Sequence, residues 1–388
     1  MTRYADMDQV AGDFYTNNFA KTAKESSLIL NLGPQHPSTH GVLRVIVEMD
    51  GEYILRAEPV LGYLHRMHEK MAEVKTAAQF IPNMGRVDYG HALAWNWAFL
   101  GAVEKLAGIE VPERAEYVRT ITCELNRIAS HLLWWGAYLL DLGAFTPIMY
   151  AFDDREKVLD ILQMPTGSRL TYSYYRIGGV ALDLSEDCLR SIREFIPWMR
   201  SRLPMYKDLV SDNIILRKRI EGVGVIEPEL CRRYGATGPV ARGSGINYDV
   251  RRAEPYSVYP KVDFIVPTSE LKDARGRYDV RMIEIEQSLR IIEQCVEQMP
   301  EGDILVKGAP KPSWKAPKGE AYFAVEGGRG KIGVYVASDG GKNIYRTKLR
   351  APGYSNLSLF AEVSSGTILA DAVAILGSLD LIIPEIDR

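Results

Sequence analysis

One long run of the sequence carries a regular apolar period, and this period limits the chain to folds with a buried helical core. Apolar residues recur in it at alternating steps of three and four: Val118, Ile121, Leu125, Ile128, Leu132, Trp135 and Leu139. Such spacing puts all of them on one side of an α-helix. A later run repeats the spacing: Met282, Ile285, Leu289, Ile292 and Val296. Because both stripes must be buried against neighbouring helices, they predict a helical bundle.

Short segments with strand character lie on either side of the predicted bundle. Three near the start cover residues 28–31, 42–49 and 52–58. The last two are joined by Asp50-Gly51, a strong hairpin signal. Three more near the end cover residues 321–325, 331–337 and 344–349. We therefore predict an α+β fold, a helical bundle flanked by small antiparallel sheets.

The remaining patterns divide the chain into segments. Further helices are expected from Gly62 onwards and over 91–106, 154–163, 185–211 with a break at Pro204, and 368–379, with an extended tail after the last. The expected segments are an N-terminal arm (1–25), a small β region with a candidate site loop (26–61), the helical bundle core (62–299), a Pro-rich connector (300–320), and a C-terminal β region, helix and tail (321–388).

Composition excludes several classes of protein. The net charge of −3, with no basic stripe, argues against a nucleic-acid binder. The longest apolar stretches, 137–152 and 368–384, are interrupted by aspartates, so no transmembrane segment is expected. The first residues lack a basic start followed by an apolar block, which makes a cytoplasmic location the default. Four scattered cysteines predict neither disulfides nor a cysteine metal site.

Two segments combine rigid turns with proton-donating side chains. NLGPQHPSTHGVLR, at 31–44, holds His36 and His40 between prolines and glycines, which restrict and direct the backbone. RVDYGH, at 86–91, places Tyr89 between an aspartate and a histidine. These segments are candidates for a catalytic site. The alternative is an ordered loop whose histidines only bond to backbone carbonyls.

The first long helix also carries polar residues. Glu124, Arg127 and His131 form a second line along it, either a paired structural network or a route for protons. Asp141 lies where this helix is expected to end, so it should bond to backbone or pair with a cation. Earlier in the chain, His65 and His68 stand three apart, but no third metal ligand is near.

A glycine- and arginine-rich segment is a weak candidate for anion binding. ARGSGINYDVRR, at 241–252, has glycines beside three arginines, a composition that suits an anion. It lacks the strand-to-helix setting and the lysine of a phosphate loop. Nucleotide binding is therefore not predicted.

Nine motifs, in order from about residue 27 to the C-terminus, resemble a known family: NLGPQHPSTHGVLR, GYLHRMHEK, RVDYGH, CELNRIASHLLWWG, DLGAFTP, YRIGGV, GSGINYDVR, SDGGKNIYRTKLRAPGYSNL and SLDLIIPEIDR. They are similar to the D subunit of NADH:quinone oxidoreductase, which forms the quinone site of respiratory complex I. That family resembles the large subunit of nickel-iron hydrogenases, which implies the same kind of fold. The hydrogenase C-x-x-C pairs would fall at RVDYGH and DLIIPE, where this chain has no cysteine. The soft thiolate ligands of a nickel centre are thus missing.

The resemblance also implies roles for particular residues. It places His40 and Tyr89 at the head-group end of a quinone cavity, with Asp141 as the acidic partner of that histidine. His36 belongs to the same loop and is a further quinone-binding candidate. The line of Glu124, Arg127 and His131 is a candidate proton-coupling network. Pro384 stands where the family commonly has glycine, so the local path of the tail is expected to differ.

The implied activity is reduction of quinone to quinol within a proton-pumping translocase. Quinone is the substrate, and this chain is expected to bind no metal or iron-sulfur cluster. The implied partners are the B subunit, carrying the terminal iron-sulfur cluster, the C and I subunits, and the H subunit in the membrane, with the chain peripheral on the cytoplasmic side of the cell inner membrane. The alternatives are a non-catalytic scaffold joining the peripheral and membrane arms, or the large subunit of a related membrane-bound complex with another donor. The sequence identifies neither that donor nor the choice between ubiquinone and menaquinone.

Overall fold

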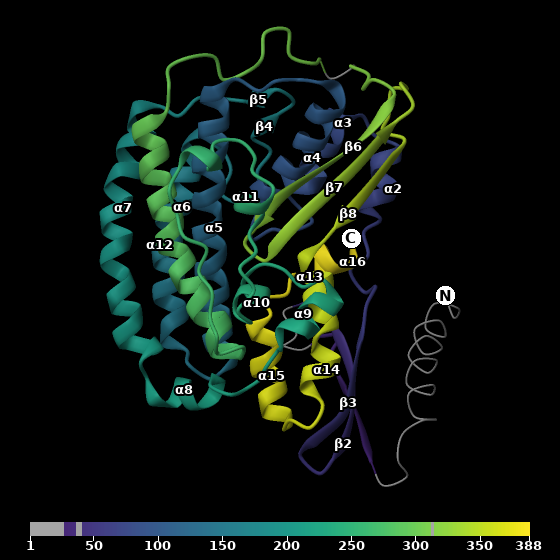
Figure 1. Cartoon of the computed structure of the whole chain (residues 1–388), viewed down its shortest axis with the longest axis vertical. Helices are drawn as coiled ribbons and strands as arrows, with labels where there is room; N and C mark the ends of the chain where they lie inside the picture. Colours follow the sequence, from purple (N-terminus) through teal and green to yellow (C-terminus); the bar gives the residue numbers. More distant parts are fainter. Residues whose placement is uncertain (1–26, 36–40, 312–313) are drawn as a thin grey trace, which may run out of the picture.

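The computed structural model describes residues 27–35, 41–311 and 314–388, and Figure 1 shows long helices beside slender sheets. The described strands form two three-stranded sheets and one two-stranded pair. The predicted α+β class is thus confirmed. His36 and His40 lie outside the described residues, as does the expected N-terminal arm.

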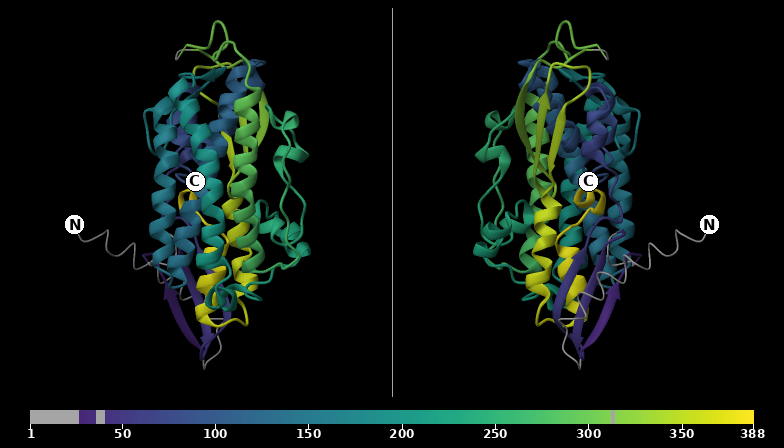
Figure 2. Two further views of the ribbon diagram at one scale, coloured as in Figure 1. Left: turned by 90° about the vertical axis from the view of Figure 1, so that its left-hand side faces the viewer. Right: turned by 90° about the vertical axis from the view of Figure 1, so that its right-hand side faces the viewer.

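The bundle is built from four long helices: α5 (Glu113–Asp141), α6 (Thr146–Thr166), α7 (Glu186–Tyr206) and α12 (Ala274–Gln298). α5 packs against both α6 and α12. Every residue of its predicted stripe is buried, and so are Ile285, Leu289 and Ile292 of the α12 stripe. Figure 2 shows these helices running alongside one another, with the segment that carries α9–α11 on one side. The apolar period therefore identified the core correctly.

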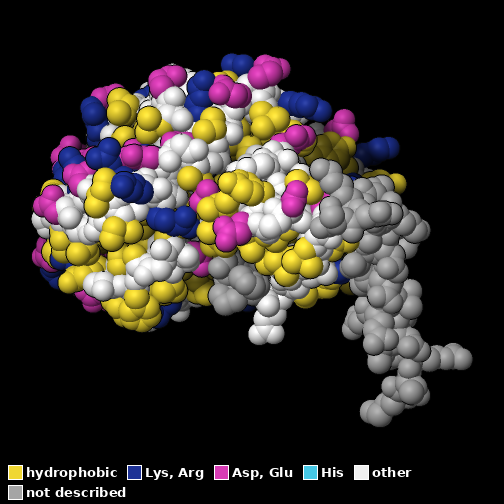
Figure 3. All heavy atoms as spheres, turned by 90° about the horizontal axis from the view of Figure 1, so that it is seen from below, with side chains coloured by type: hydrophobic (Ala, Val, Ile, Leu, Met, Phe, Trp, Pro, Cys, Tyr) yellow, Lys and Arg dark blue, Asp and Glu magenta, His cyan; other side chains and the backbone are white. Residues whose placement is uncertain are grey.

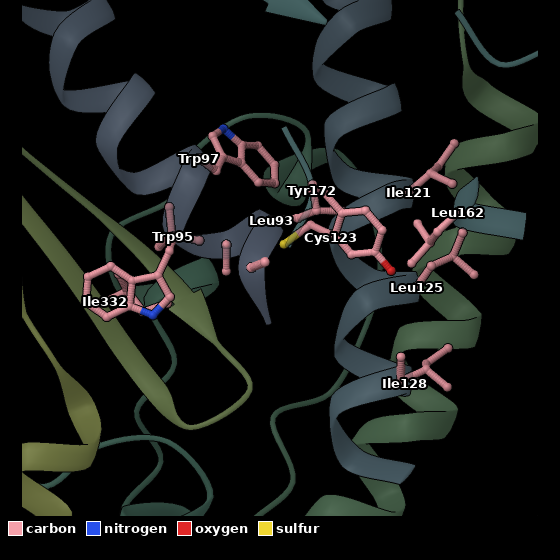
Figure 4. Close-up of a cluster of buried hydrophobic side chains, with 14 of the residues drawn as sticks. Leu93, Trp95, Trp97, Ile121, Cys123, Leu125, Ile128, Leu162, Tyr172 and Ile332 are labelled. Atoms are coloured by element: carbon pink, nitrogen blue, oxygen red, sulfur yellow. The ribbon is translucent and has the colours of Figure 1, made fainter. Parts of the chain in front are cut away.

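A second helical layer joins the bundle to the C-terminal sheet. α3 (Ala77–Met84) leads into α4 (Ala92–Ala107), whose tryptophans Trp95 and Trp97 are buried. Strands β6 and β7 of that sheet pack on α4. Figure 4 shows part of this core, with both tryptophans on one side and Ile121 of α5 on the other. One continuous apolar core therefore connects the sheet, α4 and the bundle.

The two three-stranded sheets follow the predicted strands closely. The first has the order β1 (Leu28–Leu32), β2 (Arg44–Asp50) and β3 (Tyr53–Val60). The second has the order β6 (Gly319–Gly327), β7 (Gly330–Ser338) and β8 (Arg346–Arg350). The short strands β4 (Tyr175–Arg176) and β5 (Gly179–Val180) pair with each other. All of these pairings are antiparallel.

Shorter helical elements fill the connections. They are α2 (His68–Glu73), the π-turn η2 (Lys207–Ser211), α8 (Ile214–Ile220), α9 (Pro228–Tyr234), α10 (Pro239–Arg242), α11 (Val250–Ala253), η3 (Tyr259–Lys261), α13 (Pro352–Ser358), α14 (Phe360–Ser364), α15 (Leu369–Ser378) and α16 (Ile383–Asp387). No helix in the described part of the chain is long and apolar enough to cross a membrane.

Three local predictions were wrong. The helix expected from Gly62 begins only at His68, so His65 and His68 do not share a helix face. α7 continues past Pro204 to Tyr206, and the irregular turn is η2, which begins at Lys207. A proline removes one helical hydrogen bond, and burial of flanking residues such as Met199 and Tyr206 offsets that loss. The tail is not extended. It forms α16, with Pro384 in the first turn, where a missing N–H costs nothing.

Candidate functional site

Tyr89 lies in the loop between α3 and α4, which Asp88 holds in a tight turn. The Oδ1 atom of Asp88 accepts hydrogen bonds from the backbone N–H groups of Gly90 (2.8 Å) and His91 (3.1 Å). This side-chain-to-backbone pattern is typical of Asp at turns. Asp88 is buried, whereas Tyr89 is 36% exposed. The turn thus fixes the backbone around Tyr89 while its side chain reaches the surface.

Tyr89 lines a pocket of about 240 Å³. The other lining residues are Gly41, Leu64, Arg66, Arg86, Thr171, Ile383 and Pro384. They come from the start of the chain, from the loops around α2 and α3, from the connection after α6, and from the tail. Partial burial raises the pKa of Tyr89, so its phenol stays protonated at neutral pH and can donate a hydrogen bond.

Beside this pocket, one arginine joins the Tyr89 loop to the tail. Arg329, between β6 and β7, lies 2.9 Å from Asp88 through its Nη1 and 3.2 Å from Asp380 through its Nη2. All three side chains are buried. Asp380 also lies 3.8 Å from Arg281 on α12. The segments RVDYGH and DLIIPE, far apart in the sequence, are therefore held together by buried ion pairs.

His91 anchors the other end of the Tyr89 loop. The backbone N–H of Gly328 donates to its Nδ1 (2.8 Å), so its Nε2 carries the proton and donates to the carbonyl oxygen of Cys123 (3.0 Å). Burial lowers the pKa of His91 well below its usual value. The imidazole is thus a neutral structural group, fixed in one tautomer by its two bonds.

The other site candidates are not among the described residues that line this pocket. Asp141 is the half-buried last residue of α5, and the described residues that line the Tyr89 pocket do not include it. His36 and His40 lie outside the described residues, but Gly41, the next residue after His40, lines the pocket. The structure therefore brings Gly41 of the predicted loop to the same pocket as Tyr89.

The polar line on α5 is buried and paired. Glu124 forms an ion pair with Arg127 (2.9 Å) and accepts hydrogen bonds from Tyr259 and Ser288 (both 2.7 Å). His131 instead contacts Glu284 of α12 (2.8 Å). Neighbouring arginines hold the pKa of Glu124 below its usual range, and burial lowers the pKa of His131. At neutral pH Glu124 is therefore ionised and His131 neutral.

Two arginines of the arginine-rich segment form buried ion pairs near the polar line on α5. Arg242 pairs with Glu284 (2.6 Å) and Glu326 (2.8 Å), and Arg251 pairs with Asp249 (2.7 Å). Both arginines are buried. Their donors are directed to carboxylates rather than to solvent, so they do not form the anion cradle that the composition suggested.

The histidine pair and the cysteines show no arrangement for a metal. No group of three or more His, Cys, Asp or Glu side chains suited to a metal ion occurs among the described residues. The Nδ1 of His65 lies 2.7 Å from the carbonyl oxygen of Asp387. His68 is buried, and neither of its ring nitrogens has a hydrogen-bond partner in the described ranges. All four cysteines are buried and unpaired with one another.

Comparisons with known proteins decide the family. The model of a family described as respiratory-chain NADH dehydrogenase, 49 Kd subunit, matches residues 141–315 and 309–388. The D subunit of the NADH-quinone oxidoreductase of Desulfotalea psychrophila is 58% identical over 364 residues, which cover 94% of this chain and 98% of that protein. This chain belongs to that family. The predicted resemblance is thus confirmed.

Further relatives agree over nearly the full chain. The D 2 subunit of the Opitutus terrae NADH-quinone oxidoreductase is 57% identical, covering 94% of this chain and 92% of that protein. The D subunit of the Syntrophobacter fumaroxidans enzyme is 54% identical, covering 95% of this chain and 99% of that protein. The similarity to these D subunits therefore includes the Tyr89 loop, and the match to the family model includes the tail.

The sequence patterns of this family member do not single out the groups that surround Tyr89. Arg329 lies in none of the nine motifs, and Asp380 and Glu385 belong to the tail motif without an expected role of their own. The available signal is their setting, because the two acidic residues flank the apolar run 381–384. Charged residues in an apolar segment are costly to bury unless they are paired or neutralised, so this setting indicates either a buried cation or a retained proton for each of them.

Proposed function

We propose that this chain is the quinone-binding subunit of a proton-pumping NADH:quinone oxidoreductase, and that quinone is reduced to quinol at the Tyr89 pocket. The observation that carries this proposal is a protonated phenol in a small pocket, fixed by a buried ion-pair cluster. Membership of the family and the names of the relatives support it.

The chemistry of quinone reduction suits these groups. Adding two electrons and two protons makes both quinone oxygens more basic, so hydrogen-bond donors already in place favour the reduced states. Tyr89 supplies one donor, and His40 is the proposed second, with Asp141 as its acidic partner and His36 as a further contact. An imidazole can exchange a proton near neutral pH, whereas the phenol of Tyr89 mainly donates a hydrogen bond.

We propose that the electrons come from outside this chain. The four cysteines are free and buried, and they form no group of three or more metal-ligating side chains among the described residues, whereas an iron-sulfur cluster is held by several thiolates. We propose that a cluster in the neighbouring B subunit supplies them, and that the C and I subunits and the H subunit in the membrane complete the surroundings. In this arrangement the chain is peripheral, on the cytoplasmic side of the cell inner membrane.

An apolar surface at one end of the bundle supports docking to a hydrophobic partner such as the H subunit. It surrounds a cavity of about 400 Å³ between the α5–α6 turn, η2 and α8. Its exposed apolar side chains include Phe145, Leu209 and Ile215. Figure 3 views the molecule from the end where α8 lies and shows hydrophobic side chains gathered between charged ones. Apolar groups gathered around a cavity are typical of a protein contact.

The relation to nickel-iron hydrogenases remains part of the proposal. RVDYGH and DLIIPE, where the hydrogenase cysteine pairs would fall, meet through Arg329. Carboxylates and an arginine occupy this place, so an ion-pair cluster stands where a hydrogenase would need thiolate ligands.

We also propose Glu124, Arg127 and His131 as candidates for coupling to the pump, acting through fixed charges.

Labelling with a photoreactive quinone in the assembled complex tests the proposed site. Peptides containing Tyr89, Thr171 or Pro384 should be labelled, and excess unlabelled quinone should displace the label. Peptides with Lys157 and Trp198, which line a surface groove between α6 and α7, are the matched control and should stay unlabelled. Labelling that is confined to other subunits would favour the scaffold alternative.

A further inference from the structure

Glu385 is a buried carboxyl with a single hydrogen-bond donor and no ion-pair partner among the described residues. It lies on α16 and has no exposed surface. Its Oε1 accepts one hydrogen bond, from the backbone N–H of Gly353 (2.9 Å). Its Oε2 is buried and has no hydrogen-bond partner in the described ranges. An ionised carboxylate in this setting would be costly, because a buried charge needs a cation or several donors.

The cations near Glu385 are already paired with other carboxylates. Arg329 lies between Asp88 and Asp380, and Arg281 is the second cation beside Asp380. Two positive charges and two negative charges thus face one another in this cluster. The cluster is balanced without Glu385, and ionisation of Glu385 would leave it with one excess negative charge.

The other charged groups around α16 are directed elsewhere. The guanidinium of Arg350 on β8 donates to the carbonyl oxygens of Lys331 and Gly235 and to Thr237. Asp387 accepts hydrogen bonds from the backbone N–H groups of residues 62 and 64. Arg388 donates to the carbonyl oxygen of residue 349 and lies 3.8 Å from Glu69. No ion pair to Glu385 occurs among the described residues.

We propose that Glu385 is a positioning residue of the Tyr89 site that keeps its proton at neutral pH and so leaves the cluster of Asp88, Asp380, Arg329 and Arg281 electrically balanced. Its effect on quinone chemistry rests on the function proposed above. Burial, followed by the nearby Asp88 carboxylate, raises the pKa of Glu385 to about 8. Burial also raises the pKa of Asp88, but Asp88 has an ion pair and two N–H donors, which leaves the proton on Glu385.

Loss of this proton to water adds one negative charge beside Arg329. That charge competes with Asp88 and Asp380 for the arginine, and these are the carboxylates that act on the Tyr89 phenol. A more negative surrounding raises the pKa of a phenol and weakens it as a donor. Quinone reduction should therefore decline as the pH rises through about 8.

The test is the pH profile of donor-to-quinone electron transfer in intact complex carrying Glu385→Gln. Gln keeps the shape and cannot ionise, so the variant should lose the alkaline decline that the wild type shows. Glu362→Gln, at an exposed carboxyl on α14, is the matched control and should keep the decline. Donor oxidation by an artificial acceptor should be unaffected in all three. The same alkaline decline in Glu385→Gln as in wild type would overturn the proposal.

Infrared titration of the wild-type complex gives a readout that needs no turnover. A protonated carboxyl band should disappear as the pH rises through about 8 and should be missing from Glu385→Gln at neutral pH. If that variant fails to assemble, the wild-type titration alone decides. A carboxyl band that titrates in this range supports the proposal, and the absence of such a band overturns it. A titrating carboxyl together with quinone labelling elsewhere would refute the proposed quinone site and leave the proton on Glu385 intact.

Discussion

Tyr89 depends on residues that are distant in the sequence. Its neighbour Asp88 pairs with Arg329, 241 positions later, and that arginine also holds Asp380 of the tail. Because a buried charge pair is strongly destabilised when one partner is lost, these ion pairs fix the loop as well as its electrostatics. At the level of single residues, the site is a small set of compensated charges around one phenol.

His68 is a buried histidine whose titration predicts a pH effect on stability. Burial, followed by the charge of Arg66, lowers its pKa from 6.5 to about 4. Between these values the unfolded chain binds a proton that the folded chain does not, so the free energy of unfolding falls as the pH drops. The loss is at most about 1.4 kcal/mol per pH unit, and solvent screening keeps the total below roughly 3 kcal/mol across the window.

Replacing this histidine by methionine should remove the effect. His68→Met introduces an apolar side chain of similar size that cannot bind a proton, so its advantage over wild type should be larger at pH 5 than at pH 7. Denaturant unfolding at both pH values measures the two free energies. His65→Met, at an exposed histidine, is the comparison for the general effect of replacing a histidine by methionine. An advantage of His68→Met that does not change with pH would contradict this prediction.

Tyr89 could be predicted as a site residue from its motif. The ion pairs between Arg329, Asp88 and Asp380, which balance the charges around it, could not. Local motifs place residues within a few positions of one another. The partners of Asp88 and Asp380 depend instead on how the β6–β7 turn packs against α4 and the tail. Glu385 shows the same limit, because only the packed structure reveals that its second oxygen has no partner in the described ranges.

Among the helices and strands, apolar periodicity predicted the buried elements correctly, whereas proline positions predicted helix ends incorrectly. The α5 and α12 stripes and both sheets were predicted because burial of one face imposes a regular spacing. The tail was predicted as extended, yet α16 forms with Pro384 in its first turn. Pro204 likewise lies inside α7. Tertiary packing overrides local preference where neighbouring elements supply enough buried contacts.

The exposed face of helix α8 carries a prediction about assembly. Ile215 is 71% exposed, so Ile215→Glu should change the stability of the chain by no more than about 0.5 kcal/mol. If α8 docks on a hydrophobic partner, the variant should nevertheless reduce the yield of assembled complex several-fold. Native electrophoresis of solubilised membranes measures that yield.

A matched variant separates docking from a general effect of surface charge. Leu182, in the loop before α7, is 59% exposed and does not line the cavity beside α8. Leu182→Glu should therefore assemble like wild type. Equal yields for the two variants, whether both normal or both reduced, would remove α8 as the docking face.

In the molecule as a whole, the Tyr89 pocket forms where distant parts of the chain meet. Gly41, Arg86, Thr171 and Pro384 reach it from four different segments. A correctly folded chain is therefore a condition for the site. The sequence allowed the family and the α+β class to be predicted, since nine motifs occur in order, but the motifs do not show which segments share one pocket.

Donor-to-quinone electron transfer in membranes carrying Tyr89→Phe decides whether quinone is reduced at this pocket, with assembly and donor oxidation by an artificial acceptor measured in parallel. Tyr354→Phe, at an exposed tyrosine on α13, is the matched control. Because Tyr89→Phe removes only the phenol hydroxyl, we expect normal assembly, normal artificial-acceptor activity and a loss of quinone reduction of roughly 100-fold. Quinone reduction by Tyr89→Phe at the wild-type rate would contradict a quinone site at Tyr89.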